Sequence, residues 1–182
     1  MALSKTVKRE LIHSRQIKCQ GYLREDGLWD IEAHLTDVKT QTFNAIERGE
    51  VIAGEPIHEM LFRLTMNDQL VIQKAETETL KSPFSICPEI NDDYHLLEGK
   101  QIAPGWNLMV KNLFAGVKGC THLTELLSVM ATTAFQTIFP YKNSLKSQKI
   151  KDLKLSNYLK NSCYSFDTKG KIVTQFWPDD ET

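Results

Sequence analysis

Cys120 and His122 stand one residue apart in the segment Gly119-Cys120-Thr121-His122-Leu123, so a thiol lies beside an imidazole. An apolar repeat typical of a helix follows directly. At a helix N-terminus, unpaired backbone amides and the positive end of the helix dipole favour a thiolate. The segment therefore predicts a metal ligand or a nucleophile at Cys120. A buried structural cysteine beside a surface histidine is the alternative interpretation.

Two further residues offer ligand atoms that would complement this pair. His58 ends an apolar strand face, and Cys87 lies in a loop bounded by prolines. With Cys120 and His122 they make a set of two cysteines and two histidines, which suits zinc or iron better than calcium or magnesium. Their spacing is more dispersed than in a compact zinc finger. The alternative interpretations are therefore that His58 is a core histidine and that Cys87 is a small buried residue.

The leading hypothesis is a metal- or iron–sulfur-binding accessory protein, with Cys120, His122, His58 and Cys87 as ligands. The second is an enzyme acting on a small molecule, with Cys120 as nucleophile and His122 or His58 as its base. The third is a binding module for a ligand or a protein partner, without chemistry of its own, in which the Trp106 region lines a pocket.

Four acidic residues gather around one predicted strand: Asp26, Asp30, Glu32 and Asp37. Paired carboxylates can perform acid–base chemistry if burial separates their pKa values. We expect a solvated strand face instead, with arginines such as Arg15 or Arg24 as cross-strand partners.

Composition excludes several classes of protein. The chain has 182 residues, 41% hydrophobic and 25% charged, with a net charge of −1, which argues against nucleic-acid binding. No apolar stretch approaches the roughly 18 to 20 residues that span a membrane, and residues 1–10 lack the apolar centre of a secretory signal. We therefore expect a cytoplasmic protein with free thiols. Phosphate-binding glycine loops, Gly-x-Ser-x-Gly elbows, HExxH helices and Cys-x-x-Cys pairs do not occur.

Hydrophobic periodicity predicts the elements that position these residues. Trp29, Ile31, Ala33 and Leu35 alternate with polar residues, which is typical of a half-buried strand. Three other runs predict further strands of an antiparallel meander: 17–23, 57–66 and 70–79. The connection over 36–56 is long enough to contain a short helix.

Three- and four-residue spacing predicts a helix over 106–114 and a longer one over 121–139, ended by Pro140. A short helix over 158–163 and a final strand over 171–177 would close the fold. The polar, lysine-rich stretch 142–157 predicts a flexible solvated segment, or a basic patch for a partner. We expect one α+β domain over 1–182, with its core at about 11–177: an antiparallel sheet of four to five strands packed against two to three helices.

Several short sequence motifs, taken in order along the chain, indicate a family resemblance. They are Gly21-Tyr22, Asp26-Gly27-Leu28-Trp29-Asp30-Ile31-Glu32, Gly54-Glu55-Pro56-Ile57-His58-Glu59-Met60, Ser82-Pro83-Phe84, Gly105-Trp106 and Gly119-Cys120-Thr121-His122-Leu123. The chain resembles the bacterial family catalogued as domain of unknown function 2889 over about residues 15–177. The resemblance implies a bacterial, cytoplasmic, single-domain protein. The order of elements is also similar to that of iron–sulfur cluster scaffold proteins, but their other cysteine motifs are missing.

Overall fold

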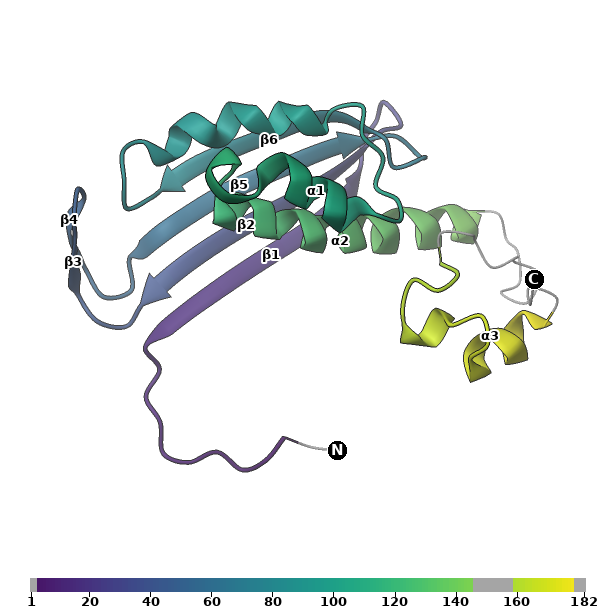
Figure 1. Ribbon diagram of the computed structural model, residues 1–182, viewed down its shortest axis with the longest axis horizontal. Helices are drawn as coiled ribbons and strands as arrows, with labels where there is room; N and C mark the ends of the chain where they lie inside the picture. Colours follow the sequence, from purple (N-terminus) through teal and green to yellow (C-terminus); the bar gives the residue numbers. More distant parts are fainter. Residues whose placement is uncertain (1–2, 146–158, 179–182) are drawn as a thin grey trace.

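The computed structural model describes residues 3–145 and 159–178. Its core is a four-stranded antiparallel sheet in the order β1-β2-β5-β6, as Figure 1 shows. The strands are β1 (His13–Leu23), β2 (Trp29–Lys39), β5 (Pro56–Met66) and β6 (Ile72–Lys81). With the helices described next, this confirms the predicted α+β class.

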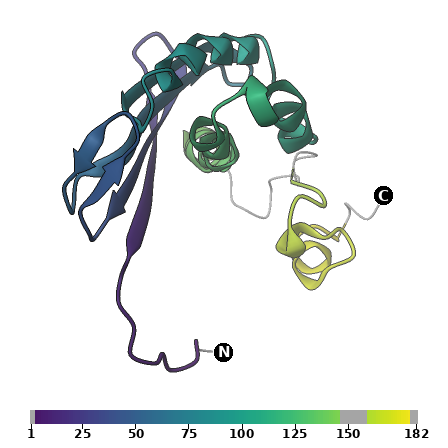
Figure 2. The same cartoon turned by 60° about the vertical axis from the view of Figure 1, so that its left-hand side comes forward.

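Helices cover one face of the sheet (Figure 1). The 3-10 helix η1 (Cys87–Leu97) packs on β6. After it come α1 (Trp106–Phe114), the turn η2 (Gly116–Lys118) and the long α2 (Thr121–Leu145). The sheet curves around α2 (Figure 2), which contacts β1, β2 and β5.

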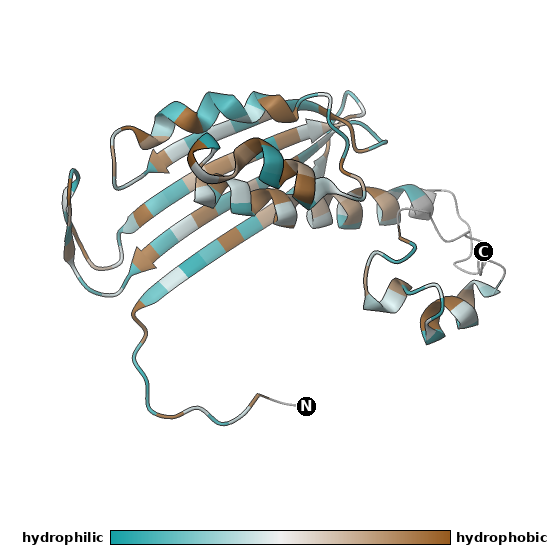
Figure 3. Cartoon of the chain, in the orientation of Figure 1, coloured by the Kyte–Doolittle hydropathy of each residue, from teal (hydrophilic) through white to brown (hydrophobic). Residues whose placement is uncertain are grey.

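Strand alternation decides which face is covered. Ile31, Leu35, Phe62 and Leu64 are all at most 1% exposed and belong to the core under the helices. Apolar and polar residues alternate along the strands in Figure 3, as expected for a sheet with one buried face. At Gly21 the backbone of β1 lies directly against α2, because a Cβ added there would be 2.1 Å from Thr137 Oγ1.

Two sequence predictions about connections are wrong. The stretch 36–56 contains a hairpin of β3 (Phe43–Ala45) and β4 (Gly49–Val51), rather than a helix. Pro140 lies inside α2 instead of ending it. Proline removes one helical hydrogen bond, and tertiary contacts hold the last turns. The Tyr141 ring packs edge-on against Trp29 at 5.4 Å, and Lys142 Nζ lies 2.6 Å from Asp68 Oδ2.

The predicted last strand is also wrong, because residues Lys171–Phe176 form the helix α3. Its β-branched run favours a strand, but its backbone hydrogen bonds close locally, for example from Trp177 N to Val173 O at 2.8 Å. Instead of the helix expected over 158–163, turns occupy 159–163, and the short helix η4 follows at Tyr164–Phe166. Residues 146–157 of the lysine-rich stretch are not among the described residues, so its prediction is not tested there. Over the described residues, no helix has the length and apolar character to cross a membrane.

Candidate metal centre

Strand register places three charged or titratable residues in one row across the sheet. Asp37 on β2 is directly opposite Arg15 on β1 and His58 on β5. Asp37 also continues the buried alternation of β2, because it lies two residues beyond Leu35 on the same face. A carboxylate therefore occupies the last core position of a central strand, under the N-terminal end of α2.

Asp37 is a buried carboxylate with several partners, since its side chain is only 1% exposed. The Arg15 guanidinium donates two hydrogen bonds to it, from Nε and Nη2 at 2.7 Å each. His13 Nε2 lies 3.1 Å from Asp37 Oδ1. A bidentate arginine pair is the geometry that best offsets the cost of burying a carboxylate.

Two histidine rings meet the same carboxylate from different elements. His58 Nδ1 lies 3.2 Å from Asp37 Oδ2, and His122 Nε2, on the first turn of α2, lies 3.3 Å from the same oxygen. The two rings stack against each other, with centroids 3.8 Å apart and planes tilted by 31°. The histidine predicted at the end of the apolar strand face and the histidine of the Cys-x-His pair therefore meet in space.

The surroundings set the protonation states of this cluster. Burial alone would raise the pKa of Asp37, but the Arg15 guanidinium outweighs it and lowers the pKa to about 2. Burial and the neighbouring His122 ring lower the pKa of His58. Burial and the Arg15 guanidinium lower the pKa of His122. At neutral pH the carboxyl group is therefore ionised and both imidazoles are neutral, which are the forms that bind metal ions.

Side-chain contacts fix the start of α2 and hence the position of His122. The buried Tyr94 hydroxyl accepts a hydrogen bond from Cys120 N at 3.1 Å and lies 2.8 Å from Thr124 Oγ1. Glu125 on the same helix pairs with Arg15 Nη1 at 2.5 Å. The guanidinium thus joins the Asp37 carboxylate of the sheet to a carboxylate of the helix.

The two predicted cysteine ligands are placed differently. Cys120 Sγ lies 3.8 Å from His122 Nδ1, the ring nitrogen that does not face Asp37. Cys87 is the first residue of η1. Within the ranges 3–145 and 159–178, the group of three or more possible metal ligands that converges is Asp37, His58 and His122, without either cysteine. All four cysteines are described and are free thiols.

Two of the ligand-atom distances in this group match those around a tetrahedral metal ion. One ligand atom from each of Asp37, His58 and His122 lies within 4.8 Å of the other two. Ligand atoms about 2.0 to 2.1 Å from a tetrahedral ion are about 3.3 Å apart. The distances of 3.2 and 3.3 Å from the histidine nitrogens to Asp37 Oδ2 match that value. In a metal-free protein the same distances suit ring N–H groups that donate to the carboxylate.

The cluster forms one wall of a cavity of about 400 Å³. Apolar side chains of the β3–β4 hairpin and of the loop before η1 also line it, among them Phe43, Ile46 and Phe84. Ligand sites commonly combine a few convergent polar groups with apolar walls in this way.

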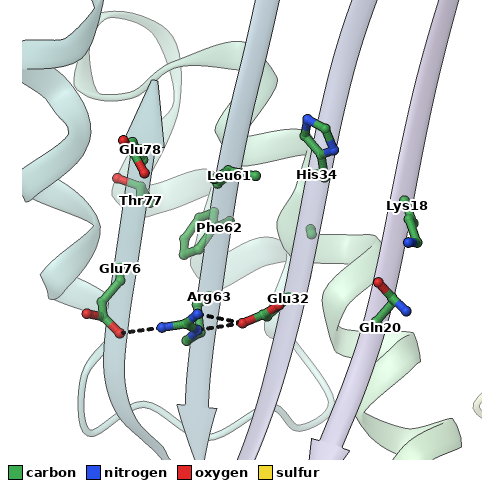
Figure 4. Close-up of a pocket in the computed structure, with 11 residues that line it drawn as sticks. Lys18, Gln20, Glu32, His34, Leu61, Phe62, Arg63, Glu76, Thr77 and Glu78 are labelled. Atoms are coloured by element: carbon green, nitrogen blue, oxygen red, sulfur yellow. Dashed lines mark hydrogen bonds and ion pairs between the residues drawn. The ribbon is translucent and has the colours of Figure 1, made fainter. Parts of the chain in front are cut away.

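A second cavity of about 440 Å³ lies on the other face of the sheet, and Figure 4 shows its lining. There Arg63 reaches Glu32 at 2.6 Å and Glu76 at 3.9 Å, while Lys18 and His34 project from the neighbouring strands. These side chains are partly exposed, and each of the two carboxylates pairs with the arginine. This face matches the solvated strand face expected for Asp30 and Glu32, in contrast to the buried Asp37 on the opposite face.

Comparison with known families agrees with the resemblance in the sequence. The profile of the family described as Protein of unknown function (DUF2889) matches residues 13–136. The chain belongs to this family. The matched segment contains the four strands of the main sheet and every residue of the Asp37 cluster. No curated protein and no solved structure matches the chain.

Sequence reasoning did not assign Asp37 or Arg15 to this site. The acidic pattern predicts a solvated strand face for Asp37, and this prediction is wrong because the side chain is buried. The signal was available in the alternation, since position 37 has the same parity as the buried Trp29, Ile31, Ala33 and Leu35. The pairing of Arg15 with a carboxylate across the strands was predicted, and Asp37 is that partner.

Proposed function

We propose that this protein binds a divalent transition-metal ion through Asp37, His58 and His122. The convergence of one buried carboxylate and two neutral imidazoles at the wall of a cavity supports this proposal. Carboxylate and imidazole ligands suit zinc or iron(II). Because three protein ligands converge among the described residues, the ion would keep positions open toward the cavity, as in catalytic metal sites.

The ion-paired side chains around Asp37 favour a cation despite the nearby guanidinium, because two carboxylates face one arginine. Arg15 contributes one positive charge, while Asp37 and Glu125 contribute two negative charges at its two ends. The group therefore has a net charge of −1 when the rings are neutral. Each carboxylate oxygen has two lone pairs, so Asp37 Oδ2 can accept from Arg15 and still bind an ion. Neutral rings need only a change of tautomer to present lone pairs to it.

Metal titration of the EDTA-stripped protein tests this function. We expect one equivalent of zinc or cobalt(II) per chain, and at least about tenfold weaker binding in His58→Ala and His122→Ala. His34→Ala is the matched control, because that ring lies on the other face of the sheet and contacts Glu59 at 3.0 Å. Circular dichroism establishes that each variant is folded. Equal affinity in all three variants, or no stoichiometric binding to the wild type, would exclude the proposal.

The cobalt(II) spectrum also tests the larger ligand set that the sequence suggests. A thiolate bound to cobalt(II) gives an intense charge-transfer absorption, which carboxylate and imidazole ligands do not give. If Cys120 is a ligand, this band appears in the wild type and disappears in Cys120→Ser. Cys87→Ser tests the other predicted cysteine in the same way. Without the band, neither cysteine is a ligand to the bound cobalt.

A second candidate function is nucleophilic catalysis at Cys120. His122 lies between Cys120 Sγ at 3.8 Å and Asp37 Oδ2 at 3.3 Å, on its two different nitrogens. This order of thiol, imidazole and carboxylate is that of catalytic triads. It predicts that iodoacetamide alkylates Cys120 of the metal-free protein faster than the exposed Cys163, and that His122→Ala abolishes the difference. Equal rates at both thiols would exclude it.

A further inference from the structure

The cavity beside the Asp37 cluster has an apolar wall that is built as a unit. Phe43 and Ile46 come from the β3–β4 hairpin, and Phe84 comes from the loop before η1. The two segments are tied together, because the Glu47 carboxylate accepts hydrogen bonds from Ser85 N at 2.8 Å and from Ser85 Oγ at 2.9 Å. These hydrogen bonds therefore hold the hairpin beside the loop that carries Phe84.

Part of this wall is exposed to solvent at the mouth of the cavity. Ile46 is 89% exposed and Phe84 is 39% exposed, whereas Ile57, which lines the same cavity, is buried. Both exposed side chains line the cavity. An apolar group of a ligand would cover them and gain the free energy of removing that surface from water.

The polar side of the same cavity also carries a lysine ammonium, Lys39, for which the described part of the chain provides no carboxylate partner. All three nitrogens of Arg15 are used, by Asp37 and by Glu125. Lys39, at the end of β2, has its Nζ 5.3 Å from the centre of the Phe43 ring. Among the described residues, no carboxylate lies within ion-pair distance of this ammonium group. Lys39 also lines the cavity.

We propose that the cavity binds a small organic anion with an apolar body, in which Lys39 pairs with the anionic group and Phe43, Ile46 and Phe84 hold the apolar part. This assignment rests on the proposed function only in that the metal ion would lie beside the bound anion. The positive charge of Lys39 complements the anionic group of the ligand, and the apolar wall complements its apolar part. The ammonium group stands at the edge of the apolar wall, so a carboxylate or sulfonate must lie next to a ring or an alkyl chain. A cavity of about 400 Å³ suits a molecule of that size.

Calorimetric titration with 4-phenylbutyrate tests this inference, with the neutral 4-phenylbutyramide as the matched ligand. Both are added to the metal-free and to the zinc-treated full-length protein. We expect the carboxylate to bind about tenfold more tightly than the amide, a difference of about 1.4 kcal/mol, because hydrogen bonds between charged partners are stronger than those between neutral ones. In Lys39→Met the carboxylate should lose this preference, while amide binding is unchanged.

Two further variants separate the contributions. Ile46→Ser should weaken both ligands by a similar factor of roughly three to ten, because it removes apolar contact and no charge. Lys18→Met is the control for loss of a surface lysine, since Lys18 lines the cavity on the opposite face, and it should leave both affinities unchanged. Lys39-dependent binding to a protein that binds no metal would support this inference while the proposed function fails. Metal binding without Lys39-dependent preference for the carboxylate would overturn this inference and leave the proposed function standing.

Discussion

Replacing Asp37 by asparagine removes the charge at the centre of the cluster while keeping the shape of the side chain. Arg15 lowers the pKa of Asp37 from 3.8 to about 2, and each pKa unit corresponds to about 1.4 kcal/mol. The ionised carboxylate therefore stabilises the fold by about 2 kcal/mol at neutral pH. Arg15 keeps a side-chain exposure of 34%, so water solvates part of the charge left behind. We expect a loss of about 2 to 3 kcal/mol, at or below the cost of breaking a wholly buried pair.

Urea unfolding of the metal-free protein measures this loss at pH 7 and at pH 3. Because the folded-state pKa is depressed, the stabilisation is complete above the unfolded value near 4 and disappears as the pH falls toward 2. At pH 3 the difference between wild type and Asp37→Asn should be smaller by roughly 1 kcal/mol. Removing metal with EDTA keeps ion binding out of the comparison.

Asp26→Asn is the matched control for this experiment. Asp26 also receives two hydrogen bonds from an arginine, Arg24, at 3.0 and 2.7 Å, but its side chain is 50% exposed. An exposed pair contributes at most about 1 kcal/mol. If Asp37→Asn costs no more than Asp26→Asn, or if its cost is the same at pH 3 as at pH 7, the argument from burial and pairing is wrong.

Tyr94→Phe should destabilise the fold by about 1 to 3 kcal/mol in thermal or urea unfolding, because it removes the hydroxyl that accepts from Cys120 N. Burial raises the pKa of Tyr94 to about 12, so stability from its neutral form is present below about pH 10 and is lost as the pH approaches 12. Absorbance titration should accordingly show one tyrosine fewer ionising near pH 10 in the native protein than in urea. Gly21→Ala should cost about 1 to 3 kcal/mol, because its Cβ would lie 2.1 Å from Thr137 Oγ1. Thr137→Ala should recover part of that loss, and no recovery would contradict the close approach of α2 to β1.

Strict periodicity made much of the fold predictable from the sequence. The strand around Ile31 alternates without exception, and the helix after Cys120 keeps an apolar stripe over many turns, so local pattern and tertiary burial agree. Predictions failed where local and tertiary preferences conflict. The β-branched residues of 171–177 favour a strand but form a helix that closes its own hydrogen bonds. Pro140 is accommodated because Tyr141 and Lys142 hold the turns after it.

The site itself was only partly predictable. His58 and His122 were singled out from their positions, and their rings stack at 3.8 Å, but nothing in their spacing indicates which strand positions face them. That information is in the strand register, which pairs Asp37 with both Arg15 and His58. Register depends on how whole strands bury their apolar faces. A carboxylate at a core-facing position, opposite an arginine on the next strand, is the signal that would have located the site.

The contacts that build the site also join the two layers of the fold. Arg15 binds Asp37 on the sheet and Glu125 on α2, and His122 reaches the same carboxylate from the first turn of that helix. A bound ion would add a further link between β2, β5 and α2, because its three ligands come from these elements. Ion binding should therefore stabilise the docking of α2 against the sheet, and loss of that docking should separate His122 from the other two ligands. Stability and binding are thus coupled through one buried carboxylate, and a variant that lowers ion affinity has to be compared with wild type at equal fraction folded.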